Sequence, residues 1–312
     1  MKRLLILACF LAVSFLEAEV SLSNLIEYDK ETCLERITKA DNSELWDVFL
    51  KVQADLFYDK EVRWIEQGIW WTQSQKILEI GSGNGAYLSK LAAQFQEKAF
   101  QGVEKLPQFV KQSKESYEDL RLGFQEGDAE IFNPQLEHSA DVVLFRLTLQ
   151  HLKDPTKALE NAWHYLKPGG FILIIDSFDK ARKSSHSLNA IEAAMQQVAE
   201  RQREQGRGNR KVTIQLLNDL EINKGPMSDL YEVVFSNLNP AGEVLSETFR
   251  FEGERDRKLL FNQLLLLLTL VNRTFEVPVD LDTAYDQLKD FLNDEAAWIL
   301  PGMHHMVLKK KM

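Results

Sequence analysis

A run of glycines directly after an apolar segment is the first place where this sequence could do chemistry. Residues Lys76–Ile80 are expected to form a strand, and Gly81–Gly85 follow them before an amphipathic segment begins. Glycines let the backbone turn tightly and let a ligand approach within contact distance. Glu79 lies two residues before Gly81, where its carboxylate could accept from an amine or a cation and would repel a pyrophosphate. The loop is therefore expected to hold a flat ligand with an amine or cationic group nearby.

Two carboxylates follow at the ends of the next two expected strands. Glu104 closes the second strand, where a carboxylate can accept hydrogen bonds from both hydroxyls of a ribose. Asp128 follows the third strand and offers an acceptor for an exocyclic amine, while the N–H of Ala129 can meet a ring nitrogen. Either carboxylate alone would be interpreted as an ordinary loop residue. Together with the glycine loop, they predict a site for adenosine that carries an amino-acid tail.

The glycine loop by itself has a competing interpretation. Gly81, Gly83 and Ala86 also satisfy the G-x-G-x-x-A spacing of dinucleotide-binding folds, which is a weak signal when taken alone. A ribose-binding carboxylate such as Glu104 is shared by both interpretations. An NAD(P)-dependent oxidoreductase is therefore an alternative, and so is a secreted protein that binds the cofactor or a partner without turnover.

The elements that must position these residues are short apolar runs separated by amphipathic helices. The expected strands are Lys76–Ile80, Phe100–Glu104, Leu122–Gln125, Asp141–Phe145 and Phe171–Asp176. This alternation is typical of an α/β fold with a doubly wound parallel sheet, whose ligands bind at the carboxyl ends of the strands. Residues 43–68 show helical spacing of their apolar side chains and predict a helical N-terminal cap.

From about Lys76 to Asp176 the sequence resembles a class I S-adenosylmethionine-dependent methyltransferase. Glu79, Gly81, Gly83 and Gly85 match the family's first motif, Glu104 its ribose acid, Asp128 and Ala129 its adenine contact, and Leu166–Gly170 its turn into the fifth strand. The resemblance implies a Rossmann-like, seven-stranded sheet whose final pair is antiparallel, with 302–311 as the last strand. It also implies S-adenosylmethionine as cofactor, and methyl transfer to a small or medium-sized acceptor at an O, N or C atom. The cofactor-binding residues that we predict are Glu79, Gly81, Ser82, Gly83, Asn84, Gly85, Glu104, Lys105, Asp128, Ala129 and Arg146.

The end of the fourth expected strand bears on the acceptor. Amino-directed DNA and glutamine methyltransferases carry Asn/Asp-Pro-Pro-aromatic there, and catechol-type enzymes place clustered carboxylates for Mg²⁺ at this edge, whereas residues 145–151 have neither. Their Phe-Arg-Leu…His-Leu order resembles the small-molecule branch, with Arg146 near the methionine end of the cofactor. His151 titrates in a range that suits a general base, but packing is its simpler role, so we assign no catalytic residue. No metal is expected, because His304 and His305 would point to opposite faces of a strand.

The C-terminal half departs from a minimal member of that family by insertion. An insertion is expected around 180–230. Its polar part, Lys180–Lys211, is expected to form a surface excursion with one helix, Leu188 to about Glu204, and a solvated basic loop, Arg201–Lys211, and a further helix, Val212–Ile222, is expected to follow. Residues 231–300 are expected to add a hairpin, in which Tyr231–Leu238 pairs with Glu243–Phe251, and further helices. Among these helices, Leu259–Val271 is expected to pack in the core.

Net charge limits the classes of partner that we expect, and the N-terminal segment bears on the cellular compartment. The 312 residues carry a formal net charge of −10, which repels polyphosphate, so nucleic-acid binding is not expected and a small-molecule or peptide acceptor is. Met1-Lys2-Arg3 precedes the uncharged run Leu4–Leu16, and Glu17 follows, which is the order of a secretory signal. We therefore expect 1–18 to be a signal peptide or N-terminal anchor, 19–75 the cap, and 76–312 the methyltransferase domain. The protein would then be exported or membrane-attached through that segment, and cytoplasmic if the segment is no signal.

Overall fold

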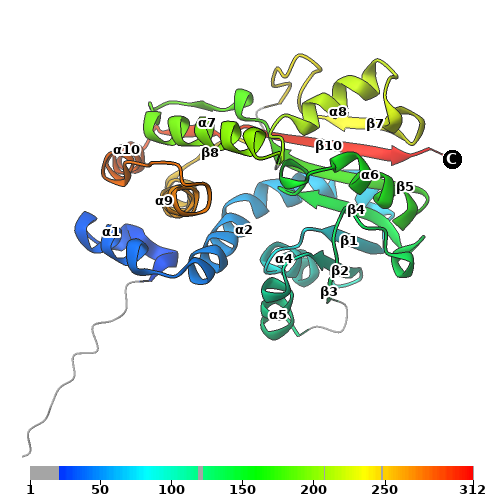
Figure 1. Ribbon diagram of the computed structural model, residues 1–312, viewed down its shortest axis with the longest axis horizontal. Helices are drawn as coiled ribbons and strands as arrows, with labels where there is room; N and C mark the ends of the chain where they lie inside the picture. The colour runs from blue at the N-terminus through cyan, green and yellow to red at the C-terminus, as the bar shows by residue number, and fades with distance from the viewer. Residues whose placement is uncertain (1–20, 119–121, 207, 247–248, 312) are drawn as a thin grey trace, which may run out of the picture.

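The computed structural model describes residues 21–118, 122–206, 208–246 and 249–311 (Figure 1). Its centre is a seven-stranded sheet in the order β3-β2-β1-β4-β5-β10-β7. The strands are β1 (Lys76–Ile80), β2 (Ala99–Glu104), β3 (Leu122–Glu126), β4 (Ala140–Arg146), β5 (Leu166–Ser177), β7 (Tyr231–Ser236) and β10 (Met303–Lys310). Strands β1 to β5 run parallel, whereas β10 is antiparallel to both β5 and β7. The expected parallel strands and the antiparallel last strand are confirmed.

Helices cover both faces of this sheet. In Figure 1, α4 (Ala86–Gln94) and α5 (Pro107–Ser116) lie on one side, and α6 (Pro155–Tyr165) and α8 (Val212–Glu221) lie on the other. Alternate residues of β4 divide between the two apolar clusters: Leu144 belongs to one and Phe145 to the other. Because successive side chains of a strand point to opposite faces, a strand covered on both sides is apolar throughout. This explains the uninterrupted apolar runs in the sequence.

A helical cap lies beyond the carboxyl ends of the parallel strands, on the left in Figure 1. Its helices are α1 (Lys30–Lys39), α2 (Asn42–Glu66), α7 (Asn189–Glu204), α9 (Glu254–Phe275) and α10 (Leu281–Asn293), whereas the short α3 (Ile69–Thr72) leads from α2 into β1 at the amino ends of the strands. A small antiparallel sheet of β6 (Lys183–Ser184), β9 (Trp298–Leu300) and β8 (Phe251–Glu252) accompanies it. The short 3-10 helices are Leu22–Glu27, Pro134–Leu136, Leu149–His151, Asp179–Ala181 and Pro226–Asp229. The expected N-terminal cap is confirmed, and it is completed by helices from the second half of the chain.

Local sequence explains where the main cap and sheet helices begin. The side chain of Asp41 accepts from the N–H of Glu44 at 2.9 Å and caps α2. At α6, Asp154 accepts from the N–H of Lys157 at 3.1 Å, and Pro155 occupies the first turn, where its missing N–H costs nothing. These two capping residues fix where α2 of the cap and α6 after β4 begin.

The structure corrects two expectations for the C-terminal half. The expected hairpin forms next to its turn, where Leu238 and Val244 form a bridge and the Leu245 N–H donates to the Asn237 carbonyl at 2.8 Å, but its two runs do not form one ladder: β7 pairs with β10 and completes the main sheet, while β8 pairs with β9. The segment 180–211, expected as a surface excursion, is also partly buried. Its helix α7 buries Ile191, Met195 and Val198, whose spacing forms one apolar face. The insertion is therefore a wall of the cap.

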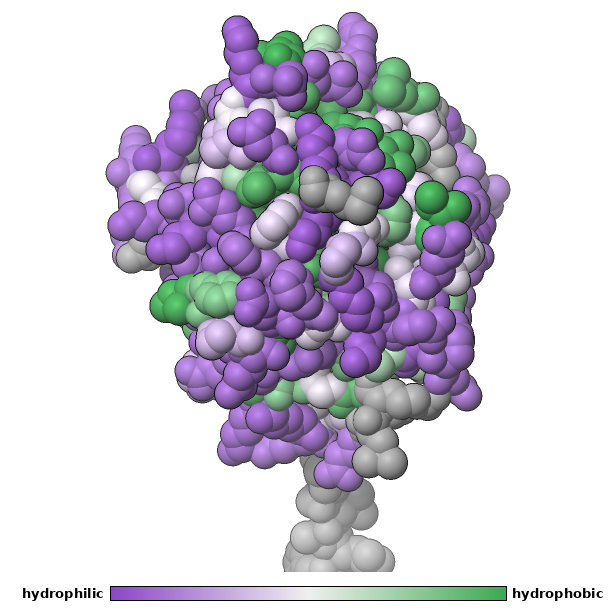
Figure 2. Space-filling model, turned by 90° about the vertical axis from the view of Figure 1, so that its right-hand side faces the viewer, coloured by the Kyte–Doolittle hydropathy of each residue, from purple (hydrophilic) through white to green (hydrophobic). Residues whose placement is uncertain are grey.

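Two further expectations concern the run Leu259–Val271 and the N-terminal segment. The run Leu259–Val271 lies within α9 and is buried in the core, as expected. Residues 1–18, expected to be a signal or anchor, lie outside the described residues. Among the residues that the structure does describe, none of the helices is both long enough and apolar enough to cross a membrane. The face turned away from the cap scatters its apolar side chains among hydrophilic ones (Figure 2).

Candidate functional site

The glycine loop connects β1 to α4 in a backbone conformation that is unfavourable for residues with a Cβ atom. Gly81, Gly83 and Gly85 all have positive φ angles. A Cβ on Gly81 would come within 2.5 Å of the Thr148 hydroxyl, which itself donates to the Ile80 carbonyl at 3.1 Å. The tip of β4 therefore packs directly against the loop, and only glycine leaves room for both.

The carboxylate of Glu104 is turned onto this loop. Its Oε2 accepts from the Gly83 N–H at 3.0 Å, and its Oε1 accepts from the Leu106 N–H at 2.8 Å. Both partners belong to the backbone around the ends of β1 and β2. The two residues that the sequence predicts as neighbours in a ribose site are thus in direct contact.

Asp128 lies at the adjoining strand end and is held by a neighbouring lysine. The backbone links the two strand ends, since the Gly127 N–H donates to the Glu104 carbonyl at 3.0 Å. Lys105 Nζ lies 2.7 Å from the Asp128 carboxylate. Burial acts to raise the pKa of Asp128, but the Lys105 ammonium and the Glu130 N–H outweigh it and hold the pKa below its usual value. Both predicted residues, Lys105 and Asp128, therefore lie together at this edge.

Two buried polar groups at the loop have no protein partner. Glu79 is fully enclosed and its Oε2 has no hydrogen bond, and the Ser82 hydroxyl is likewise buried and unpaired. Burial raises the pKa of Glu79 to about 8, against the lowering effect of the Arg146 charge. A buried carboxyl group without a donor is costly unless a ligand supplies one.

Arg146, at the end of β4, is held by the cap. Its Nε donates to the Glu61 carboxylate at 2.8 Å, and its Nη1 to the Gln53 side chain at 3.4 Å, both on α2. The guanidinium lies 4.2 Å from the centre of the Tyr87 ring. Burial works to lower the pKa of Arg146, but the Glu61 charge raises it overall. This predicted cofactor residue thus joins the sheet edge to α2.

A cavity of about 390 Å³ separates the sheet edge from the cap. Gly83 and Leu147 line it on the sheet side, whereas α2, α7 and α9 line it with mostly apolar side chains. Leu147 adopts a positive φ of 53°, a conformation that is uncommon for a leucine. Glu104 and Asp128, which are predicted to bind a nucleoside, do not line the cavity. Gly83 both contacts Glu104 and lines the cavity, so it connects the two parts of the site.

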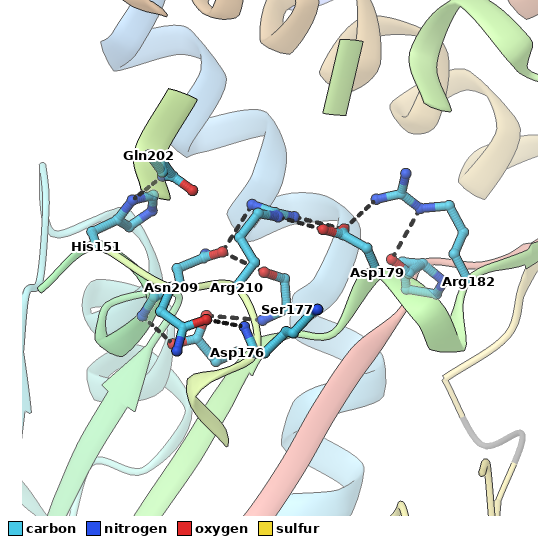
Figure 3. A network of polar contacts seen from close by, with 11 residues as sticks. His151, Asp176, Ser177, Asp179, Arg182, Gln202, Asn209 and Arg210 are labelled. Carbon is cyan, nitrogen blue, oxygen red and sulfur yellow. Dashed lines mark hydrogen bonds and ion pairs between the residues drawn. The ribbon is translucent and has the colours of Figure 1, made fainter. Parts of the chain in front are cut away.

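A polar network occupies one end of the cavity wall (Figure 3). The Arg210 guanidinium forms two hydrogen bonds with the Asp179 carboxylate and donates to Gln150 Oε1 at 2.9 Å. The Ser177 hydroxyl donates to the same oxygen of Gln150. Arg210, expected on a solvated basic loop, is instead half-buried, because the α7–α8 connection folds back over β4, where the Asn209 N–H donates to the Gln150 carbonyl at 2.9 Å.

Burial shifts the pKa of two titratable groups at this end toward the uncharged form, so that near pH 7 Asp176 is about half ionised and His151 is uncharged. Asp176 is enclosed at the end of β5, and burial raises its pKa to about 7, although the Ser177 and Gln150 N–H groups oppose the shift. His151 lines the cavity, and desolvation lowers its pKa to about 4, with the Arg210 charge adding to the effect. His151 is thus an uncharged imidazole and a weak base.

Sequence reasoning missed the contributions of the cap. Glu61, Gln202 and Arg210 come from segments outside the region of family resemblance. Of the six tryptophans, the cavity is lined by Trp46, whereas Trp64 and Trp71 pack in the core. Within the described parts of the chain, no group of three or more His, Cys, Asp or Glu side chains could hold a metal ion.

A family model and a relative of known function match part of the chain. Residues 78–174 match the family model of a methyltransferase domain. Over 104 residues the chain is 25% identical to a demethylmenaquinone methyltransferase from Deinococcus radiodurans, and the match covers 33% of this chain and 43% of that protein.

Among solved structures, the chain is similar to a plantazolicin methyltransferase in complex with SAH. That similarity has a TM-score of 0.48 and 17% identity, and it covers 93% of this chain and 94% of the other. It is also similar to the CurJ carbon methyltransferase, with a TM-score of 0.31 and 22% identity over 33% and 29% of the two chains.

Proposed function

We propose that this protein, whose residues 78–174 form a class I S-adenosylmethionine-dependent methyltransferase domain, transfers the methyl group of that cofactor to a small or medium-sized acceptor. The acceptor would be a small molecule or a peptide and would bind in the cavity beneath the cap. The observation that carries this proposal is the contact of the Glu104 carboxylate with the Gly83 N–H, beside the unpaired carboxyl group of Glu79. One carboxylate suits ribose hydroxyls and the other suits an amine.

The residues present fit S-adenosylmethionine. Its ribose hydroxyls would replace backbone donors on Glu104, its adenine amine would be accepted by Asp128, and its amino-acid ammonium would supply a donor to the buried, unpaired oxygen of Glu79. The bound cofactor supplies an electrophilic methyl group on a positively charged sulfur. The predicted roles of Ser82, Asn84, Lys105 and Ala129 remain predictions.

The chain's own contribution to the reaction is positioning and exclusion of water. In methyl transfer the acceptor's electron pair forms the new bond to carbon while the carbon–sulfur bond breaks and sulfur keeps its electrons, so alignment supplies much of the rate. The apolar cavity walls keep water from the reacting atoms, and Leu147 at the tip of β4 helps to shape the space beside Gly83. The pKa of about 4 makes His151 a weak base, so we propose it as a hydrogen-bonding residue rather than the proton acceptor.

Isothermal titration calorimetry with S-adenosylmethionine and S-adenosylhomocysteine tests cofactor binding directly. We expect wild type to bind both, and Gly83→Asp to bind neither, because the new carboxylate would lie beside that of Glu104 at a positive-φ position. Gly123→Asp is the matched control, since Gly123 lies on exposed surface with open space around it. Folded wild-type protein that binds neither compound would refute the proposal.

A labelled-donor assay separates transfer from binding. Protein incubated with methyl-tritiated S-adenosylmethionine and a panel of hydroxyl, amine and carbon acceptors should yield labelled product together with S-adenosylhomocysteine. A nicotinamide-dependent enzyme would instead quench or shift NADH fluorescence and gain no thermal protection from S-adenosylhomocysteine. The panel also decides which type of atom is methylated.

We further propose that residues 1–18 direct export or attach the protein to a membrane, on the basis of the uncharged run after Lys2 and Arg3. Mass spectrometry of the N-terminus of protein from its native source tests this. A mature chain that begins after Ala18 would support cleavage, whereas an intact Met1 on protein recovered from the soluble cytosolic fraction would contradict both forms of the proposal.

A further inference from the structure

The cavity beneath the cap has one end where polar side chains cluster, and its other walls are mostly apolar, with Gln53 of α2 and Gln263 of α9 among them. Phe49 of α2, Ile191 and Met195 of α7, and Leu260, Leu264 and Leu267 of α9 line its apolar part. Polar side chains gather where the tip of β4 and the end of β5 meet the α7–α8 connection, and these are Gln150, His151, Ser177, Gln202 and Arg210. A ligand that fills this cavity must therefore be apolar along most of its surface and polar at one end.

Gln202 supplies an unsatisfied hydrogen-bond acceptor at the polar end. The side chain is 3% exposed, and its Oε1 has no partner. Its Nε2 lies 3.5 Å from His151 Nδ1, and Figure 3 shows the amide oxygen turned away from that imidazole. A buried amide oxygen without a donor costs free energy, which a ligand N–H or O–H would recover.

The four charged side chains around Asp179 balance in formal charge. Arg182 and Arg210 both pair with Asp179, and Glu192, which lines the cavity, also acts on Arg182. Two guanidinium groups thus face two carboxylates. Five of their ten N–H groups donate to Asp179, to Gln150 or to the Pro301 carbonyl. A charged ligand head would upset this balance and would lose its hydration without gaining a matched partner.

We propose that the methyl acceptor is a largely apolar molecule whose polar end is a single neutral hydrogen-bond donor, a hydroxyl or an uncharged N–H, held by Gln202. This inference rests on the proposed function for its role in catalysis. The binding preference itself belongs to the cavity and can be measured without the cofactor.

Four probes with one apolar body test the preference. These are 2-naphthol, naphthalene, 2-naphthoate and naphthalen-2-ylmethylammonium, titrated into the full chain by calorimetry at neutral pH. We expect 2-naphthol to bind about tenfold more tightly than each of the other three, which is the order expected for one net hydrogen bond. Tightest binding by the carboxylate or by the ammonium would overturn the proposal.

Variants of α7 assign the preference to a residue. Gln202→Leu should weaken 2-naphthol binding about tenfold while leaving naphthalene binding unchanged, because it removes the acceptor and keeps the bulk. Gln197→Leu makes the same change on the exposed face of α7 and should change neither. Met195→Trp should weaken all four probes by filling the apolar part of the cavity. Unchanged 2-naphthol binding in Gln202→Leu would overturn the role of Gln202, and unchanged binding in Met195→Trp would overturn the location.

The two proposals can fail separately. Probe selectivity that depends on Gln202, in a protein that does not bind S-adenosylmethionine, would refute methyl transfer and support the cavity preference. Cofactor binding with no selectivity among the probes would support the proposed function and refute the cavity preference.

Discussion

Arg146 and Glu61 form a buried ion pair that joins the central sheet to the cap, with Arg146 Nε 2.8 Å from Glu61 Oε2. Glu61 is fully enclosed, and its Oε1 and Arg146 Nη2 have no partner. The pair therefore fixes α2 over the end of β4, and it leaves two polar atoms beside Glu79 and Tyr87 that a ligand could satisfy.

Glu61→Ala should be strongly destabilising, because it leaves the Arg146 charge buried without a carboxylate. Removal of one partner from a buried pair costs about 3–5 kcal/mol in the free energy of unfolding. Asp59→Ala is the matched control on the same helix, since Asp59 forms an exposed pair with Arg255 at 3.0 Å and such pairs contribute about 1 kcal/mol or less. Urea unfolding of the three proteins measures both. Equal losses in the two variants would contradict the structural role assigned to Glu61.

Glu79 should make the protein less stable as the pH rises. Burial raises its pKa from 4.5 to about 8, so the folded protein keeps this proton to about pH 8, whereas the unfolded chain releases it near 4.5. The stabilising contribution is thus complete below about pH 4.5 and is lost as the pH rises toward 8. Relative to Glu79→Gln, the free energy of unfolding of wild type should fall by up to about 1.4 kcal/mol per pH unit across that window. Parallel curves for the two proteins in urea titrations would exclude this shift.

The same carboxyl group predicts how cofactor binding depends on pH. A ligand ammonium favours the ionised form of Glu79, so the affinity for S-adenosylhomocysteine should increase as the pH rises from about 6 to about 8 in wild type. Glu79→Gln should bind more weakly and with a flatter profile. Identical pH profiles in the two proteins would show that the ligand's amine does not lie near Glu79.

The sequence predicted those parts of the site whose residues lie in loops at neighbouring strand ends. Gly83 and Glu104 lie at adjacent strand ends, so strand order and a glycine loop suffice to bring them together. The pairing of Glu61 with Arg146 depends instead on how α2 crosses the sheet, which local pattern does not specify.

A signal for the missed residues was nevertheless present. Glu61 follows Phe57 by four residues and precedes Ile65 by four, so it is an acidic residue on an apolar helical face. Gln202 stands in the same relation to Val198 on α7. Polar residues inside an apolar stripe are candidates for buried partners or ligand contacts, and both of these helices border the cavity. The expected hairpin is confirmed only beside its turn, because two extended runs around a turn do not reveal that the first one pairs with the last strand of the sheet.

Gly208 should be required to keep Arg210 at the cavity. Its φ is +84°, and a Cβ there would come within 2.1 Å of the Gln150 carbonyl oxygen, a backbone atom that cannot easily move. Gly208→Ala should therefore displace the α7–α8 connection and weaken the contacts of Arg210 with Asp179 and Gln150. Gly206→Ala is the control, because its φ is also positive but nothing lies within 4 Å. We expect acceptor turnover to fall by at least about tenfold in the Gly208 variant beyond any loss in the control. Equal activities of the two variants, measured with labelled donor, would contradict this.

His305 should make the protein sensitive to acid. Both of its ring nitrogens are buried without a partner, and the ring stacks on Phe249 with centroids 3.4 Å apart. Burial lowers its pKa well below 6.5, with the neighbouring His304 and Arg146 adding to the effect. The unfolded chain therefore takes up a proton near pH 6.5 that the folded protein does not bind, so stability is complete above that pH and is lost as the pH falls below it.

His305→Phe removes the titrating group and keeps an aromatic ring of similar size against Phe249. Because no buried nitrogen is then left unpaired, the variant should be at least as stable as wild type at about pH 7 and more stable by about 1–2 kcal/mol at about pH 5. His164→Phe, on an exposed position of α6, provides the control and should keep the acid sensitivity of wild type. Thermal unfolding at the two pH values gives the result. A loss of stability on acidification that is as large in His305→Phe as in wild type would assign the acid sensitivity to other groups, of which buried His304, with a pKa lowered to about 3, is the next to be replaced.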